Sequence, residues 1–575
     1  MGSIDQQPTD ALAAARQMLD DDSLLISGSE TSHASPMVSS ITSNSSSQSV
    51  PDDTSPPNAE EPALQLPTLD PSDFRWHPSP TDSSVLQRKA NGVEALVGIK
   101  DENAIGAYDF YNNIVLRVAD ISGLTLPRLK RAFVRAMLDS RFENPSIACY
   151  GVWGQNKEPH LPHIQYRPFK SHSEARAWAH NSIFVRATTL TSQELRAERI
   201  KKRRAAAVPQ PANSLDIIIS ADVADERTPL EPGTKVDIMF LFNHLSWDGK
   251  ARYFTSELVQ RAAEILDKGE ENTVPAHRWG EEKARLDPPI LDVMLVGLDR
   301  LGPDYEVVHR KLLNSQLQVG LSWGLPVTND QGDPLQFRHC MNIEDSKKIA
   351  DAVRARLGSK HNVGHLGHAA TVLALLKHNP IPAAARETAF LFSPLPVDGR
   401  LYLSEERKTR RYGNAQAAAV VEFQKLASWG INEEDPEGVK VALDNLAKKV
   451  KEDYDYWLGQ SDYLLPISVA NHNYVSNLLA TSNAVPEVHA PPFCNDGRSE
   501  NIISHEVLGP SGNKLFEVDD CFIGVEVMGY NAFIRMDTRK DAIRLTFCYN
   551  NGCFSDALAE TYTKDVAQYM LAYAK

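Results

Sequence analysis

Residues 235–258 read KVDIMFLFNHLSWDGKARYFTSEL, and this stretch predicts a strand, a short loop and a helix in that order. Residues 236–242 form an apolar run of aromatic and branched side chains, which is typical of a buried strand. Residues 246–249 (SWDG) mark a tight turn, and apolar residues recur after it at helical spacing. His244 and Asp248 are therefore expected on a loop between two rigid elements, where an imidazole is a candidate general base near neutral pH.

The pentapeptide His-x-x-x-Asp is by itself a weak signal. The chain has 17 histidines, so chance alone gives about one such pattern at typical acidic usage. Only His244 has an aspartate four residues further on. A turn histidine beside a helix-capping aspartate is the alternative interpretation, and other parts of the chain must decide between the two.

Composition limits the class of protein. The chain has 575 residues, of which 42% are hydrophobic, which is enough for two sizeable cores. Its net charge of −15 argues against nucleic acid or an anionic membrane as the main partner. The six cysteines are scattered, no apolar run reaches membrane-spanning length, and the N-terminus lacks the features of a signal peptide. We expect a soluble, cytoplasmic monomer with reduced thiols.

The chain divides into a tail and two folded halves. Residues 1–66 are rich in Ser, Thr, Pro, Asp and Glu, so we predict a disordered N-terminal tail. Residues 10–25 could form a short amphipathic helix within it, although a solvated tail is the preferred interpretation. We place an N-terminal lobe at residues 67–330, which carries His244, and a C-terminal lobe at residues 331–575.

Periodicity predicts mixed α and β structure without a regular βαβ alternation. In the first half we predict strands at 108–118, 146–153, 214–220 and 236–242, and helices at 126–138, 173–187, 192–204, 252–266 and 287–301. In the second half we predict strands at 335–340, 388–395, 415–423, 463–470, 504–507, 521–528, 533–536 and 542–549, and helices at 343–357, 362–377, 439–458 and 555–573. We therefore expect a mixed α/β fold of two similar lobes with a cleft between them.

Two motifs of the second half add to the HLSWDG motif of residues 244–249. They are VDGR at residues 397–400 and YGN at residues 412–414. In this order the three motifs resemble the CoA-dependent acyltransferases, which include chloramphenicol acetyltransferase, the plant BAHD enzymes and peptide-synthetase condensation domains. The chain looks most similar to the fungal trichothecene 15-O-acetyltransferases. Residues 544–570 also resemble the last strand and helix of that superfamily, so the resemblance covers about residues 70–575.

The chain departs from two branches of the superfamily. The plant enzymes carry Asp-Phe-Gly-Trp-Gly late in the chain, whereas residues 520–524 read DCFIG without a tryptophan. Condensation domains usually have a second histidine just before the catalytic one, whereas this chain has Asn243 before His244. These differences argue against a plant-type enzyme and against peptide-bond formation.

The resemblance implies a fold and an activity. The fold would consist of two chloramphenicol-acetyltransferase-like lobes with an active-site channel between them, and the C-terminal lobe would include a crossover segment near residues 490–530. The activity would be acyl-CoA-dependent O-acyl transfer, with acetyl-CoA as co-substrate and no metal. The acceptor would be a hydroxyl of a hydrophobic secondary metabolite such as a sesquiterpenoid.

The resemblance also implies roles for individual residues. His244 would be the general base that takes the proton of the acceptor hydroxyl in a ternary complex. Asp248 would point away from the reacting groups and pair with Arg400, which would fix the loop. The N–H of Gly249 and the side chain of Asn495 are candidates for stabilising the oxyanion. For Asn495 a plain turn is the alternative, because Asn-Asp-Gly is a strong turn sequence.

Three other interpretations remain open. His361, His365 and His368 have the spacing of one helical face and could bind zinc or nickel. However, Gly364 and Gly367 weaken a helix there and no carboxylate or cysteine ligand follows, so we expect no metal. The acceptor could be an amine, giving an amide, or the chain could be a catalytically inactive relative that binds a small molecule.

Overall fold

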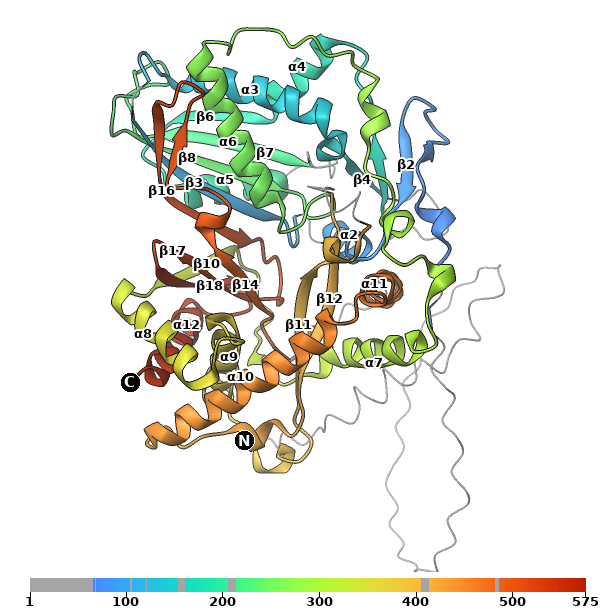
Figure 1. Ribbon diagram of the computed structural model, residues 1–575, viewed down its shortest axis with the longest axis vertical. Helices are drawn as coiled ribbons and strands as arrows, with labels where there is room; N and C mark the ends of the chain where they lie inside the picture. Colours follow the sequence, from blue (N-terminus) through green and yellow to red (C-terminus); the bar gives the residue numbers. More distant parts are fainter. Residues whose placement is uncertain are drawn as a thin grey trace, which may run out of the picture. The chain divides into compact units, whose positions relative to one another are not determined.

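The predicted buried strand is β8 (Lys235–Phe242), and it lies near the middle of a six-stranded sheet (Figure 1). The strand order is β15 (Glu506–Leu508), β16 (Lys514–Val525), β3 (Phe110–Val118), β8, β7 (Leu215–Ala221) and β6 (Ile183–Ala187). Neighbouring strands are antiparallel except for β7 and β6, which are parallel. The C-terminal half of the chain thus supplies two strands to the sheet that carries His244.

The structure, a computed structural model, describes residues 66–67, 69–103, 106–119, 121–153, 161–204, 214–404, 413–480 and 485–575. Residues 66–575 form one compact unit. The predicted tail, apart from Leu66, and the helix considered at residues 10–25 lie outside the described residues, as does Tyr412 of the YGN motif. No helix in the described ranges is long and apolar enough to cross a membrane.

Alternation along the strands gives the six-stranded sheet two apolar faces. Helices α3 (Leu126–Glu143) and α6 (Ala251–Lys268) cover one face, as Figure 1 shows. Phe240, Phe242 and Phe254 are buried in the core between these helices and the sheet, as the sequence predicted. Helix α5 (Ser192–Arg204) contributes to a smaller cluster on the other face, and α4 (His172–Asn181) packs beside α3.

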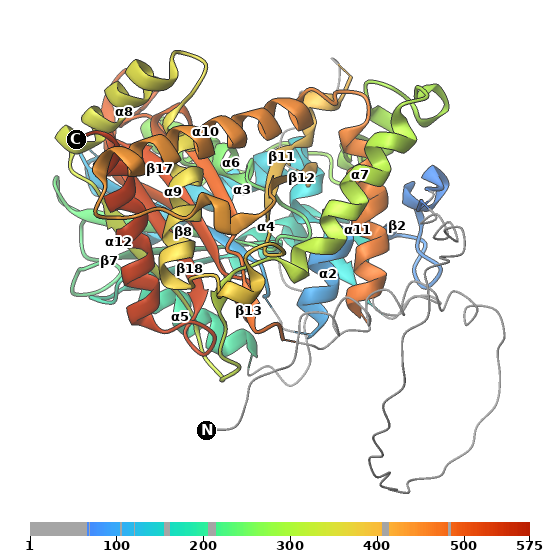
Figure 2. The same cartoon turned by 90° about the horizontal axis from the view of Figure 1, so that it is seen from below.

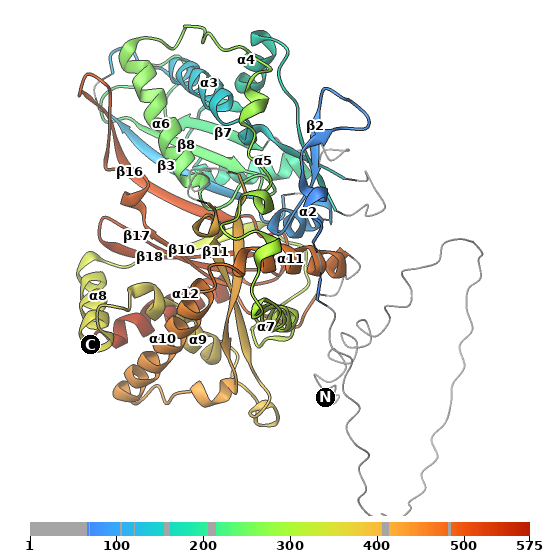
Figure 3. The same cartoon turned by 45° about the vertical axis from the view of Figure 1, so that its right-hand side comes forward.

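A second sheet has the order β10 (Pro334–Cys340), β18 (Ala542–Asn550), β17 (Phe533–Arg539) and β14 (Phe493–Arg498), of which only β14 and β17 are parallel neighbours. Four helices lie on its side of the molecule, α8 (Ile343–Leu357), α9 (Val363–His378), α10 (Pro436–Leu458) and α12 (Asp556–Tyr573). Strands β11 (Leu391–Asp398) and β12 (Gln416–Phe423) form an antiparallel pair. In Figure 3, β16 lies beside β3 and next to β17 and β18, so it links the two sheets.

The remaining elements are small sheets and three helices. A four-stranded sheet has the order β1 (His77–Pro78), β2 (Leu86–Lys89), β5 (His163–Tyr166) and β4 (Tyr150–Val152), and β9 (Leu325–Pro326) pairs with β13 (Val488–His489). Helices α2 (Val93–Asn103), α7 (Tyr305–Gln318) and α11 (Leu464–Ala480) lie side by side in Figure 2. The predicted mixed α/β fold is confirmed.

One predicted strand is a helix. Residues 463–470 were expected to be a strand, but they begin helix α11. Leu464, Leu465, Ile467 and Val469 are all buried, so the apolar residues surround the helix and leave no helical period to detect. A short apolar run of this kind cannot be assigned from periodicity alone.

Two predicted helices are also partly wrong. Residues 173–187 contain helix α4 only to Asn181, and its last part is strand β6, whose branched residues pair with β7. Residues 287–301 contain two short 3₁₀ turns, Ile290–Val293 and Leu298–Arg300, in place of a helix. Two prolines at 288–289 and a glycine at 297 interrupt this segment, and α7 begins after it. Neither α7 nor α2 was predicted.

Candidate active site

The loop between β8 and α6 is closed by hydrogen bonds from its own residues. The side-chain oxygen of Asn243 accepts the N–H of Leu245 at 3.1 Å, and its carbonyl accepts the N–H of Ser246 at 3.1 Å. The carboxylate of Asp248 accepts the N–H of Lys250 at 3.0 Å, just before α6 begins. These local bonds give the sequence NHLSWDGK a defined turn, as expected for Asn and Asp side chains.

The His244 ring has a geometry suited to a general base. Its Nδ1 lies 2.7 Å from the carbonyl oxygen of Trp247. Because a carbonyl oxygen can only accept a hydrogen bond, Nδ1 carries the proton and Nε2 of the neutral ring keeps its lone pair. The ring is half-buried and packs edge-on against Phe110, with ring centroids 5.3 Å apart. In this tautomer Nε2 can accept a hydrogen bond, and the ring is held in place by its contacts with Trp247 and Phe110.

The backbone of His244 is held from both sides by residues far away in sequence. Its N–H donates to the carboxylate of Asp109 at 3.2 Å, and its carbonyl accepts the side-chain N–H of Asn414 at 3.1 Å. Gly413, next to Asn414, forms a β-bridge with Trp247. Gly413 and Asn414 of the YGN motif therefore lie against the loop, although the asparagine was not among the predicted site residues. A buried polar residue inside a recognised motif was the signal for Asn414, whereas nothing in the sequence singled out Asp109.

Replacing Asn414 with aspartate tests this contact. Asn414 is buried, and its side-chain oxygen Oδ1 also accepts the N–H of Gln416 at 3.2 Å. A carboxylate keeps that bond but cannot donate to the carbonyl of His244, which would be left facing a buried charge. We expect a loss of about 1–3 kcal/mol in the free energy of unfolding, measured by urea denaturation, together with a lower kcat. Wild-type stability and kcat in Asn414→Asp would contradict this role.

Asp248 and Arg400 form the buried ion pair that the resemblance implies. Arg400 Nη1 lies 2.9 Å from Asp248 Oδ2, and Nη2 lies 3.1 Å from Oδ1. The two side chains are only 4% and 7% exposed. Burial alone would raise the pKa of Asp248, but the Arg400 guanidinium and the N–H groups of Ala415 and Lys250 more than offset it, so the pKa is lowered. The aspartate is thus a charged support of the loop.

The ion pair brings all three motifs together. The guanidinium of Arg400 also pairs with Asp398 at 3.0 Å and donates to the carbonyl of Gly413 at 2.6 Å. The N–H of Ala415 donates to Asp248 at 2.8 Å. Gly399 has no room for a side chain, because a Cβ there would collide with the carbonyl oxygen of Ala415. The glycine of VDGR is therefore required by close packing of this motif against the segment after YGN.

The two residues that carry the candidate oxyanion donors are both exposed. Gly249 is exposed, and its N–H donates to no group among the described residues. Asn495 is also exposed, and its side-chain oxygen accepts the N–H of Gly497 at 3.2 Å, which is the turn considered as the alternative. Its side-chain nitrogen lies against Gly364 at the start of α9. Within the described residues, no hydrogen bond joins Asn495 to the His244 loop directly.

The three histidines of residues 361–368 make hydrogen bonds within the protein. His365 Nδ1 accepts the N–H of Asn362 at 3.1 Å and completes a capping box at the start of α9. His368 contacts the hydroxyl groups of Tyr454 at 3.2 Å and Ser393 at 3.0 Å. Burial lowers the pKa of His365 to about 4 and that of His368 to about 3, so both rings are neutral at pH 7. In the described part of the chain, no three His, Cys, Asp or Glu side chains are grouped to hold a metal ion.

Comparison with known proteins defines first the class and then the family. The fold matches the first condensation domain of the calcium-dependent antibiotic synthetase with a TM-score of 0.53, at 13% identity, over 84% of this chain and 95% of that chain. The fold is therefore that of the chloramphenicol-acetyltransferase-like proteins, as the sequence predicted. The model of the 15-O-acetyltransferase Tri3 family matches residues 66–476, and the chain belongs to this family.

Curated relatives and one solved structure agree with this assignment. A provisionally named 15-O-acetyltransferase of Stachybotrys chartarum, SAT12, is 67% identical over 97% of this chain and 100% of its own length. The trichothecene O-acetyltransferase TRI3 of Trichoderma arundinaceum is 32% identical, covering 89% and 99%. The structure of the trichothecene 15-O-acetyltransferase TRI3 from Fusarium sporotrichioides matches with a TM-score of 0.81, at 30% identity, over 88% of this chain and all of that chain. The protein is an acyltransferase.

Proposed function

We propose that the protein transfers an acetyl group from acetyl-CoA to the C-15 hydroxyl of a trichothecene-type sesquiterpenoid. The observation that carries this proposal is the hydrogen bond between His244 Nδ1 and the Trp247 carbonyl, which leaves Nε2 as the base. The names of the relatives support the acceptor, since they are trichothecene 15-O-acetyltransferases. The acyl donor supplies an activated thioester, so no metal is needed for the reaction.

His244 performs the proton transfers in this proposal. Nε2 accepts the proton of the acceptor hydroxyl while the oxygen forms a bond to the thioester carbonyl carbon. The same imidazolium returns the proton to the sulfur as the carbon–sulfur bond breaks, leaving an ester and free CoA. The enzyme itself is not acetylated, because a ternary complex holds both reactants together and proximity supplies much of the acceleration.

Two donors are proposed for the negative charge on the tetrahedral intermediate. The N–H of Gly249 makes no hydrogen bond among the described residues, so it is available to a bound carbonyl. The side-chain N–H₂ of Asn495 is the second candidate, because the turn to Gly497 uses only its oxygen. One such donor contributes about 10²–10³-fold to kcat in other acyl-transfer enzymes. Asp248 and Arg400 support the loop and take no part in proton transfer.

We also propose that the site lies between two lobes of one chain. Residues 67–330 supply the loop with His244, and residues 331–575 supply Arg400 and Asn495. A channel between the lobes would admit acetyl-CoA and the alcohol from solvent. Since one chain contains every proposed site residue, a cytoplasmic monomer is sufficient for activity.

The test is an acceptor-dependent transfer assay. Purified protein is mixed with acetyl-CoA and a trichothecene that has a free C-15 hydroxyl, and thiol release is measured together with the product mass. We expect thiol release only with the acceptor, and NMR should place the acetyl group on the C-15 oxygen. A matched acceptor with an amine in place of this hydroxyl distinguishes ester formation from amide formation, because an N-acyltransferase would acetylate the amine. Thermal stabilisation by CoA without any transfer would indicate an inactive relative.

A further inference from the structure

Arg252, in the first turn of α6, connects the His244 loop to a strand of the second sheet. Its Nε donates to the carbonyl of Gly249 at 3.3 Å, and its Nη1 donates to the carbonyl of Asp496 at 2.9 Å. The same Nη1 lies 3.8 Å from the carboxylate of Asp496. One guanidinium therefore holds the backbone next to both candidate oxyanion donors, Gly249 and Asn495.

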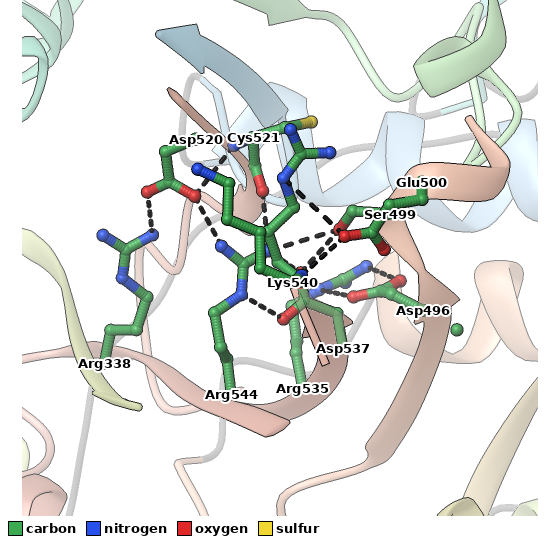
Figure 4. Close-up of polar contacts among 12 residues, drawn as sticks. Arg338, Asp496, Ser499, Glu500, Asp520, Cys521, Arg535, Asp537, Lys540 and Arg544 are labelled. Carbon is green, nitrogen blue, oxygen red and sulfur yellow. Dashed lines mark hydrogen bonds and ion pairs between the residues drawn. The ribbon is translucent and has the colours of Figure 1, made fainter. Parts of the chain in front are cut away.

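The partner of Arg252 is itself held firmly. Asp496 receives two hydrogen bonds from Arg535 of the neighbouring strand β17, at 2.6 Å and 3.0 Å, and Figure 4 shows the two side chains facing each other. Burial alone would lower the pKa of Arg535, but the Asp496 carboxylate more than offsets it, so the pKa is raised. The pairing of β14 with β17 shifts register between Asn495 and Gly497, so Asp496 has no partner residue across this pair of strands.

A second set of ion pairs joins β17, the neighbour of β14, to the rest of the molecule. Asp520 of β16 pairs with Arg338 of β10 at 3.1 Å and with Arg544 of β18 at 2.5 Å (Figure 4). Arg544 also pairs with Asp537 of β17. The network thus joins β16, which belongs to the six-stranded sheet, to three strands of the second sheet. Asp496 is bound through Arg535 to β17, which this network holds, and Arg252 connects the His244 loop to Asp496.

We infer that Arg252 is a positioning residue for acyl transfer, which sets the spacing between the Gly249 N–H and the Asn495 side chain. The inference rests on the proposed function, because it assigns Arg252 a role only through the oxyanion donors. Only 17% of the Arg252 side chain and 10% of the Asp496 side chain are exposed, so water competes little for the contact between them, whereas the contact with Gly249 is exposed. A planar guanidinium is suited to holding two acceptors in fixed directions, whereas a lysine amine holds its donors on a flexible chain.

Arg252→Lys tests this inference, since it keeps the positive charge but loses the planar guanidinium that holds two acceptors in fixed directions. We expect kcat to fall by about 10²-fold, the effect of misplacing reacting groups by about 1 Å. The KM for acetyl-CoA should remain at its wild-type value because the charge near Asp496 is retained, while the lost hydrogen bonds should lower the thermal unfolding midpoint only slightly, so kcat is expressed per folded molecule. A role in stability alone would lower the unfolding midpoint and the fraction of folded enzyme, and would leave kcat per folded molecule unchanged.

The matched control is Arg261→Lys on the same helix, where Arg261 pairs with Glu143 at 2.8 Å in an exposed position. This control should keep wild-type kcat. Wild-type kcat in Arg252→Lys, or a kcat loss fully explained by unfolded protein, would overturn the inference. His244→Ala distinguishes a failure of the Arg252 inference from a failure of the proposed mechanism. If it loses turnover while Arg252→Lys does not, only the positioning inference fails, and if it remains active the proposed mechanism itself fails.

Discussion

His244→Ala should lower kcat for acetyl transfer by about 10²–10⁴-fold, the usual contribution of a general base. The variant loses the only group proposed to take the proton of the acceptor hydroxyl. Folding should change little, because the half-buried ring makes one hydrogen bond to the described residues, with the Trp247 carbonyl, and this bond is worth about 1 kcal/mol. The measurement is steady-state thiol release with a saturating acceptor, together with the thermal unfolding midpoint and CoA binding.

His505→Ala provides the matched control, because His505 is exposed and lies outside the proposed site. It should retain wild-type kcat, CoA binding and stability. The two variants together separate loss of a base from loss of any histidine. A kcat in His244→Ala within a few-fold of the wild-type value would show that another group takes the proton.

Asp248→Asn should destabilise the fold by about 3–5 kcal/mol, the usual effect of breaking a buried ion pair. The amide leaves the Arg400 guanidinium without its most buried counter-charge, although Asp398 remains 3.0 Å from it. The measurement is the free energy of unfolding in urea at neutral pH. Asp398→Asn is the control, because Asp398 is 29% exposed and its removal leaves the Asp248–Arg400 pair intact, so it should cost much less.

The Asp248–Arg400 ion pair should also make the stability difference between wild type and Asp248→Asn depend on pH. The pKa of Asp248 is lower in the folded chain than in the unfolded chain, where an aspartate carboxyl group titrates at about 3.9. Its stabilising contribution is therefore complete above that value and is lost as pH falls through the lowered folded pKa. The difference in unfolding free energy between wild type and Asp248→Asn should shrink in that acidic range. A difference that stays constant there would contradict a charged Asp248.

Local patterns were sufficient for much of the fold. The branched and aromatic run of β8 and the helical spacing of α6 predicted both elements to within two residues. Patterns failed where burial removed the period, as in α11, and where prolines broke an apolar stretch before α7. The entry of β16 into the first sheet depends on pairing with β3, about 400 residues earlier, and no local pattern specifies such a partner.

The site was predictable only in part for a related reason. The side-chain chemistry of His244 and its place between strand and helix follow from the sequence, and the pairing of Asp248 with Arg400 was inferred from the family resemblance. The contacts that hold the loop come from residues far away in the sequence, such as Asp109 and, through Arg252, Asp496. Such polar residues are common on protein surfaces, so the sequence does not single them out, and only the tertiary fold brings them next to the loop.

A crystal structure of the complex with CoA and the trichothecene acceptor tests the central claim most directly. The quantity to measure is the distance from His244 Nε2 to the oxygen of the C-15 hydroxyl. We expect a hydrogen bond of about 2.6–3.2 Å, with the same oxygen facing the sulfur of CoA. A hydroxyl out of reach of His244 and hydrogen-bonded to a different base would contradict it.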